Sequence, residues 1–263
     1  MNRPIDTRVG QILDDDNRFL GRSVFSDWER ELRSPSDTLL VALGARELTS
    51  LDREAIRLVS RCLIPPDLRV GPLRLARLRS SRGDAVAGYL GGQLVTAGRV
   101  MGPGAGRHAA RCLHRVGEST GLDPSTEEVR AAVDAWKREA GTTIIGGFGV
   151  PFRPQDERRV ALVRFVGDGP LARRRHWQLH FRVVEALAPT PPNVVISIVA
   201  LLLDVGVPAE RCGLAVSVLM QHVFLAHALE AAQTDGALTS LPRELVGYRG
   251  IAARHTSALG TPE

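Results

Sequence analysis

The sequence predicts an all-α protein, and three observations carry that prediction. Ala, Leu, Val and Arg dominate the composition while aromatic residues make up only 5%, which favours helices packed through aliphatic faces over a β-sandwich. Apolar residues recur at helical spacing along most of the chain. Hydrophobic residues make up 44% of 263 residues, so the chain is long enough to bury a sizeable core.

In the first half, helices are predicted between glycine and proline breaks. One runs to Gly44, with Ser36 or Asp37 as its N-cap, and the next follows Thr49 and ends before the Pro-Pro pair at 65–66. The segment 85–100 is small and apolar. Its three glycines let another helix approach closely, which predicts a buried central helix.

The second half begins at the Gly-Pro-Gly breaker 102–104. The pattern then predicts helices over 109–116, 126–140, 157–166, 171–188, 195–205 and 209–232. The segment 142–154 is different, because it combines a short extended run with a glycine-rich turn. Such a turn exposes backbone amides and lets a ligand come close.

Charge and motifs argue against nucleic-acid and nucleotide-hydrolysing functions. The net charge is +5 with a pI near 9.8, and the arginines cluster at 69–82 and 173–175. We interpret both clusters as solvated basic faces, because no recognition motif or aromatic stacking platform accompanies them. The sequence also contains no Walker-type loop and no dinucleotide-binding glycine fingerprint.

Cysteines and hydropathy predict a cytoplasmic protein. Cys62, Cys112 and Cys212 are far apart and odd in number, as expected for free thiols in a reducing compartment. The polar N-terminus does not resemble a signal peptide. The longest apolar runs, 194–205 and 214–229, are interrupted by polar residues, so we predict no membrane span.

Three segments, in the right order, resemble motifs of the citrate synthase family, including its short citryl-CoA lyase-like members. Residues 98–106 are similar to the turn where a catalytic His starts a His-Gly-Gly-Ala segment. Residues 146–150 followed by Asp156 and Arg158 resemble the family's Pro-Gly-Phe-Gly-His loop and Asp-Pro-Arg. Residues 192–195, 201–208 and 226–227 resemble its Pro-Asn-Val-Asp helix, Leu-Gly-Ile-Pro turn and Ala-His. A weaker echo of the family's C-terminal motifs lies around Leu241 and Tyr248.

The resemblance implies a large helical domain and a smaller helical domain with an interdomain cleft. The large domain would comprise 1–101 and 213–263, and the small domain 102–212. It also implies a homodimer, or a heterodimer with a citrate synthase-like chain.

The residues that the family uses for catalysis are replaced in this sequence. Met101, Val150 and Val195 stand at the positions that match its two histidines and its carboxylate, and none of these side chains can transfer a proton. Met220 and Leu241 match two of its substrate-binding arginines, whereas Arg158 is retained. We therefore predict a dry, apolar cleft and no citrate synthase activity.

Candidate site residues follow from the same matches. The predicted substrate cleft comprises Met101, Phe148, Val150, Phe152, Arg158, Asn193, Val195 and Met220. Gly146, Gly147 and Gly149 form a candidate coenzyme A-side loop. His108, His222 and Arg158 are the catalytic candidates, although His108 is expected at the surface. His176 and His180 share a helix face without a third ligand, so we expect surface histidines and no metal site.

Three hypotheses remain open from the sequence. The first is a repurposed enzyme that acts on an acyl thioester, such as a coenzyme A thioester, or on a hydrophobic intermediate of specialised metabolism. The second is a non-catalytic partner or regulatory subunit of an active citrate synthase-like chain. The third is Claisen or retro-Claisen chemistry carried by other residues, such as His108, His222 or Arg158.

Overall fold

The computed structural model is almost entirely helical. It describes residues 7–25, 34–45, 48–64, 68, 70–81, 83–96, 98, 101–121, 123–150, 154–234, 244 and 247. The helices are α2 (Pro35–Ala42), α3 (Ser50–Cys62), α4 (Gly71–Ser80), α5 (Ala85–Thr96), α6 (Gly102–Ser119), α7 (Thr126–Glu139), α8 (Glu157–Val166), the 3-10 turn η1 (Pro170–Arg173), α9 (Arg175–Ala186), α10 (Val194–Asp204), α11 (Ala209–Leu219) and α12 (Gln221–Thr234). The all-α prediction is confirmed.

A small antiparallel sheet near the N-terminus was not predicted. It is formed by β1 (Gly10–Ile12), β2 (Asn17–Phe19) and β3 (Arg22–Ser23), in that order. Gly10 pairs with Phe19 and Arg18 pairs with Ser23. The strands are two or three residues long and β1 is exposed throughout, so they carry no alternating apolar pattern that the sequence would reveal.

Helix starts follow the capping residues. Thr49 caps α3 in a reciprocal capping box with Asp52, as the sequence indicated. The cap of α2 is Ser34 instead of the predicted Ser36 or Asp37. The breaker 102–104 does separate two helices, but these residues form the first turn of α6. A proline is tolerated there because the N–H that it lacks would have no helical partner.

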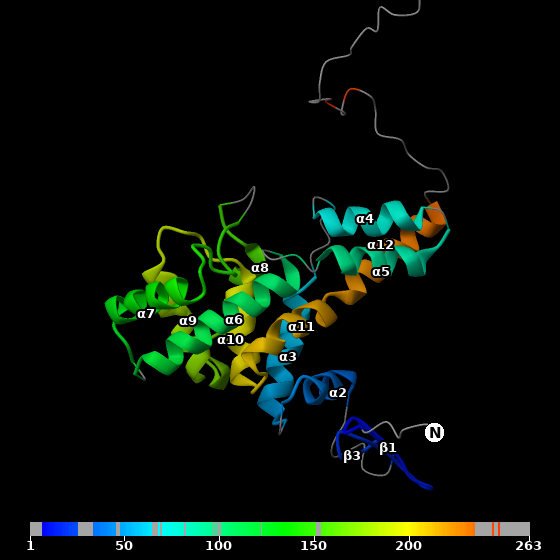
Figure 1. Cartoon of the computed structure of the whole chain (residues 1–263), viewed down its shortest axis with the longest axis horizontal. Helices are drawn as coiled ribbons and strands as arrows, with labels where there is room; N and C mark the ends of the chain where they lie inside the picture. Colours follow the sequence, from blue (N-terminus) through cyan, green and yellow to red (C-terminus); the bar gives the residue numbers. More distant parts are fainter. Residues whose placement is uncertain are drawn as a thin grey trace, which may run out of the picture.

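Most of the described helices share one hydrophobic core, and we call this part the body. It comprises α2, α3 and α6 to α11, and its buried residues run from Leu40 to Leu219. Helix α10 lies at its centre, because its residues from Ile196 to Leu202 are fully buried and it packs against α3, α6, α8, α9 and α11. Figure 1 shows α10 surrounded by these helices.

Helices α4, α5 and α12 form a separate three-helix unit that projects from the body (Figure 1). Its own core is small, with Leu73, Ala76, Val223 and Phe224 buried. The prediction of a buried central helix at 85–100 is wrong for α5. Gly88 and Gly92 face α4 and α12 closely, but α5 exposes its large apolar residues: Val86, Leu90, Leu94 and Val95.

The predicted helix 209–232 is divided at Met220 into α11, which belongs to the body, and α12, which belongs to the three-helix unit. Taken together, residues 209–233 are long and apolar enough to cross a membrane by length and composition. Half of that window is buried inside the protein, as in core helices of globular proteins.

The body joins α2 and α3 to helices from 102–219, and the domain boundaries at 101 and 212 stay a prediction.

Candidate functional site

Three segments that are distant in the sequence meet at one place in the body. A Cβ atom at Gly146 would come within 2.2 Å of the Ala105 carbonyl oxygen, in the first turns of α6. A Cβ atom at Gly147 would lie 2.8 Å from the backbone nitrogen of Ile196, in the first turn of α10. Phe148 also pairs with Pro192 in an isolated β-bridge. The start of α6, the glycine loop 146–150 and the start of α10 are therefore in direct contact.

Hydrogen bonds hold the glycine loop from both sides. The Gly146 N–H donates to Nδ1 of His108 at 3.1 Å, and the Gly149 N–H donates to the Pro191 carbonyl at 2.7 Å. Asn193 contributes twice, with its backbone N–H to the Gly147 carbonyl at 2.8 Å and its side-chain amide to the Gly149 carbonyl at 3.1 Å.

This network changes the expectation that the turn offers its amides to a ligand. The Gly146 and Gly149 amides are used inside the protein. Gly147 and Gly149 have φ near +87°, a conformation that glycine adopts without strain. The loop is thus a preformed turn whose position is set by α6 and α10.

Arg158, the polar candidate of the predicted cleft, pairs with Asp156. The Asp156 carboxylate accepts hydrogen bonds from Nε and Nη2 of Arg158 at 2.9 and 2.8 Å. It also accepts from the Val194 N–H at 2.9 Å, at the first turn of α10. Burial acts to raise the pKa of Asp156, but the hydrogen bonds from Arg158 and Val194 outweigh it and hold the pKa below its usual value. The pair thereby ties the start of α8 to the start of α10.

The apolar cleft candidates differ in exposure. Met101 is 46% exposed at the N-cap of α6. Phe148, Val195 and Met220 are partly buried and pack against the core of the body, and Met220 also contacts the core of the three-helix unit. Val150 is partly buried. Phe152 lies outside the described residues, as do Leu241 and Tyr248.

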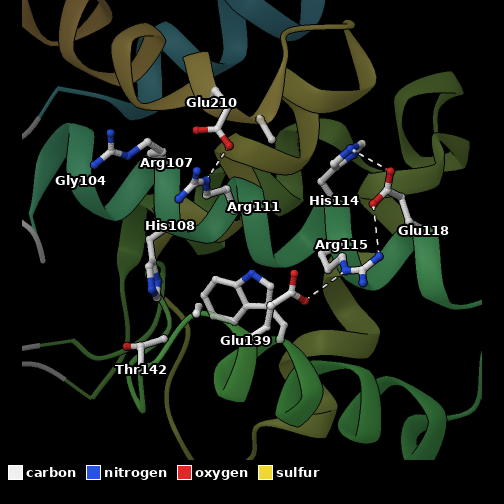
Figure 2. A pocket seen from close by; sticks show the side chains of 13 residues that line it. Gly104, Arg107, His108, Arg111, His114, Arg115, Glu118, Glu139, Thr142 and Glu210 are labelled. Atoms are coloured by element: carbon white, nitrogen blue, oxygen red, sulfur yellow. Dashed lines mark hydrogen bonds and ion pairs between the residues drawn. The ribbon is translucent and has the colours of Figure 1, made fainter.

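A pocket that the sequence did not predict runs along the exposed face of α6 (Figure 2). Its volume is about 520 Å³, and its other walls are the end of α7 with the following turn and the start of α11. The lining is mostly polar, in contrast to the dry cleft that the sequence suggested. Its arginines are Arg107, Arg111 and Arg115. Their spacing of four residues, which places them on one helix face, is the signal that the sequence reading missed.

Ion pairs occupy part of this pocket. Arg111 donates through Nε to Glu210 at 2.5 Å. At the far end, Arg115 lies 3.4 Å from Glu139 and 3.8 Å from Glu118, and His114 lies 3.4 Å from the Glu118 carboxylate. Figure 2 shows the His114, Arg115 and Glu118 group well separated from Arg107, Arg111 and His108.

His108, which the sequence placed at the surface, lines this open pocket. Its side chain is partly buried, because the ring packs edge-on against Trp136 with 4.7 Å between centroids. Since Nδ1 accepts the Gly146 N–H, a neutral ring carries its proton on Nε2. His108 therefore connects the pocket wall to the glycine loop.

The other candidate histidines lie elsewhere. His222 is exposed on α12. His176 bonds through Nδ1 to Asp204 at 2.9 Å. His180 is fully buried against the Trp177 ring, so its expected surface position is wrong. Burial lowers its pKa to about 3. Among the described residues, no group of three or more His, Cys, Asp or Glu is arranged to hold a metal ion.

The three cysteines are buried free thiols, as small hydrophobic side chains in helices would be. Burial raises the pKa of Cys112 and of Cys212 to about 12. These thiols are accordingly protonated at neutral pH and are not nucleophiles.

Comparison with solved structures identifies the fold. The chain is similar to the citryl-CoA lyase from Hydrogenobacter thermophilus, with a TM-score of 0.77 and 19% identity over 96% of this chain and 97% of that one. It is also similar to the ATP citrate lyase from Methanothrix soehngenii, solved in complex with citrate and coenzyme A, with a TM-score of 0.71, 16% identity and coverage of 96% and 43%.

A citrate synthase from Thermoplasma acidophilum matches with a TM-score of 0.57 and 15% identity over 85% of this chain and 59% of that one. No family model matches the sequence, and no curated protein does. The protein thus has a citrate synthase-like fold of the size of a citryl-CoA lyase.

Proposed function

We propose that this protein is a repurposed enzyme of the citrate synthase-like fold that binds a coenzyme A thioester, or a related hydrophobic acyl substrate. The observation that carries the proposal is the likeness to a citryl-CoA lyase over nearly the full length of both chains. The convergence of the α6 start, the glycine loop and the α10 start supports a single binding region there.

The proposed chemistry is neither synthesis nor cleavage of citrate. Met101, Val150 and Val195 belong to the three converging segments, and they offer no group that removes a proton or polarises a carbonyl. Arg158, the retained cation, is already paired with Asp156. Such a region would bind and orient an apolar chain, so that catalysis would depend on positioning.

The alternative function is a partner subunit without catalysis of its own. The supporting observation is the apolar surface of the three-helix unit. Val86, Leu90 and Leu94 recur every four residues on α5 and are 67%, 52% and 76% exposed. Exposed apolar stripes of this kind mark interaction sites, and we propose that this one pairs with a second copy or with a citrate synthase-like chain.

Thermal unfolding in the presence of ligands tests the enzyme proposal. Acetyl-CoA and longer acyl-CoAs are expected to raise the melting temperature. At a hundredfold excess over Kd, the ligand adds about 2.7 kcal/mol to the free energy of unfolding. Oxaloacetate and citrate are expected to have no effect. Phe148→Ala removes a side chain of the glycine loop and should weaken the acyl-CoA effect, whereas Phe165→Ala, on the exposed side of α8, should not.

Two outcomes would contradict the proposal. The first is the absence of any acyl-CoA effect. The second is an equal loss of acyl-CoA stabilisation in the Phe148→Ala and Phe165→Ala variants. Molar mass from light scattering, alone and with an active citrate synthase-like chain, tests the partner alternative, which predicts a complex of two chains.

A further inference from the structure

The proposed function leaves the pocket along α6 unexplained. Its lining contains none of the predicted substrate-cleft residues, and it contains one catalytic candidate, His108. It follows the exposed face of α6 from Gly104 to Glu118, whereas Met101, at the N-cap, is the one predicted cleft residue at this helix. We propose that this pocket binds a small polar molecule through a phosphate or diphosphate group, held by Arg107 and Arg111.

The two arginines lie on the same side of α6 and line the same pocket. They are four residues apart on one helix, so their Cβ atoms are about 6 Å apart and their side chains lie on the same face. Figure 2 shows both at the same end of the pocket, beside His108 and Gly104. Planar guanidinium groups match the geometry of phosphate oxygens through paired N–H donors.

The distribution of charge distinguishes the two ends of the pocket. At the Arg115 end, two carboxylates, Glu118 and Glu139, accompany one arginine. At the other end, Glu210 is the carboxylate that pairs with Arg111, and Arg107 makes no ion pair with the described residues. One positive charge is therefore uncompensated at the Arg107 end.

Glu210 also orients its partner. It bonds to Nε of Arg111, so the terminal nitrogens of that guanidinium remain available for another acceptor. An anion between Arg107 and Arg111 would then gain charge-assisted hydrogen bonds from both arginines.

The size and lining of the pocket indicate what the ligand carries besides its phosphate. A volume of about 520 Å³ lies within the range of sites that bind complete small molecules. The remaining walls mix charged pairs with the hydroxyl of Thr142. Such walls suit a ligand whose remaining part is rich in hydroxyl groups. A phosphorylated sugar or a nucleotide has this chemistry. The inference rests on these charges and holds whether or not the protein acts on a thioester.

Titration calorimetry with inorganic pyrophosphate tests the inference on the full chain. Wild-type protein is expected to bind, and Arg107→Gln should weaken binding at least tenfold. The matched control is Arg182→Gln on α9, which removes the same charge from an exposed ion pair with Asp123 and should change Kd less than twofold. Far-ultraviolet circular dichroism would verify that both variants fold.

Two results would overturn the proposal. One is a wild-type protein that does not bind pyrophosphate at millimolar concentrations. The other is an equal loss of affinity in both variants, which would mean attraction to net charge alone. Displacement of pyrophosphate by ribose 5-phosphate, but not by ribose, would extend the result to a phosphorylated sugar. Equal displacement by both sugars would contradict the role given to the phosphate.

Discussion

The body and the three-helix unit both contain strongly apolar helices but bury them to very different extents. In the body, α10 is buried along nearly its whole length, and its neighbours cover every face. In the unit, the hydrophobic core cluster consists of Leu73, Ala76, Val223 and Phe224, while α5 and α12 leave large side chains exposed, among them Leu94 and Leu229.

The difference shows two ways of stabilising helices. The body relies on the volume of its core, because buried aliphatic side chains contribute through area removed from water. The unit relies on close backbone approach: a Cβ atom at Gly88 would lie 2.4 Å from the Ala76 carbonyl oxygen. Close approach of this kind leaves the large side chains on the outside, where they are available to another chain.

The largest effect is expected from shortening one buried side chain in the body. Leu201→Ala removes a fully buried side chain from α10 and should lower the free energy of unfolding by about 2–5 kcal/mol. The matched substitution in the unit, Leu94→Ala, affects a side chain that is 76% exposed and should cost less than about 0.5 kcal/mol in dilute solution. Urea unfolding measures both, and equal losses would remove the distinction between the two regions.

The second largest effect is expected from the pH dependence of stability. His180 is buried in the body with its pKa lowered from 6.5 to about 3, so between these values the unfolded chain binds a proton that the native state does not. The free energy of unfolding should therefore fall as pH decreases below about 6.5, by roughly 1.4 kcal/mol per unit.

Urea unfolding at pH 6.5 and pH 5 checks this slope, above the range in which carboxylates titrate. His180→Gln should flatten it. His222→Gln, which alters an exposed histidine of the unit, should leave it unchanged. If the slope persists in the His180→Gln variant, the pH dependence of the free energy of unfolding comes from other groups.

The smallest expected effects come from two glycines of the same helix. Gly88→Ala places a methyl group against Ser80 and the Ala76 carbonyl, and overpacking of this kind costs about 1–3 kcal/mol. Gly91→Ala meets nothing within 4 Å and should stabilise α5 by about 0.5–1 kcal/mol. Thermal midpoints should move in opposite directions. Movement in the same direction would mean that α4 and α5 are not closely packed.

Much of the fold follows from local signals in the sequence. The capping box at Thr49 and the apolar spacing of residues 157–166 and 195–205 predict helices close to those observed. The interior position of α5 was inferred from small residues alone. Glycines indicate close contact on one face, but they do not indicate what covers the opposite face, and here its leucines are exposed.

The resemblance suggested that residues near the start of α6, in the glycine loop and near the start of α10 line one cleft. In the structure these three segments are in contact, and the cleft itself stays a prediction. The side-chain partners were not predictable, because His108 and Gly146 are 38 residues apart and their contact depends on how α6 packs. The charged pocket was missed for a related reason: its carboxylates come from α6, α7 and α11.

The break at Met220 divides one apolar segment between the two parts of the molecule. Residues 209–234 form two helices in succession, with about 17 and 21 Å of helical rise. One end, at Ala209 and Glu210, is a wall of the charged pocket, and the other end packs among α4 and α5. The wall of the charged pocket and the core of the three-helix unit are therefore adjacent stretches of the same chain segment, joined at Met220.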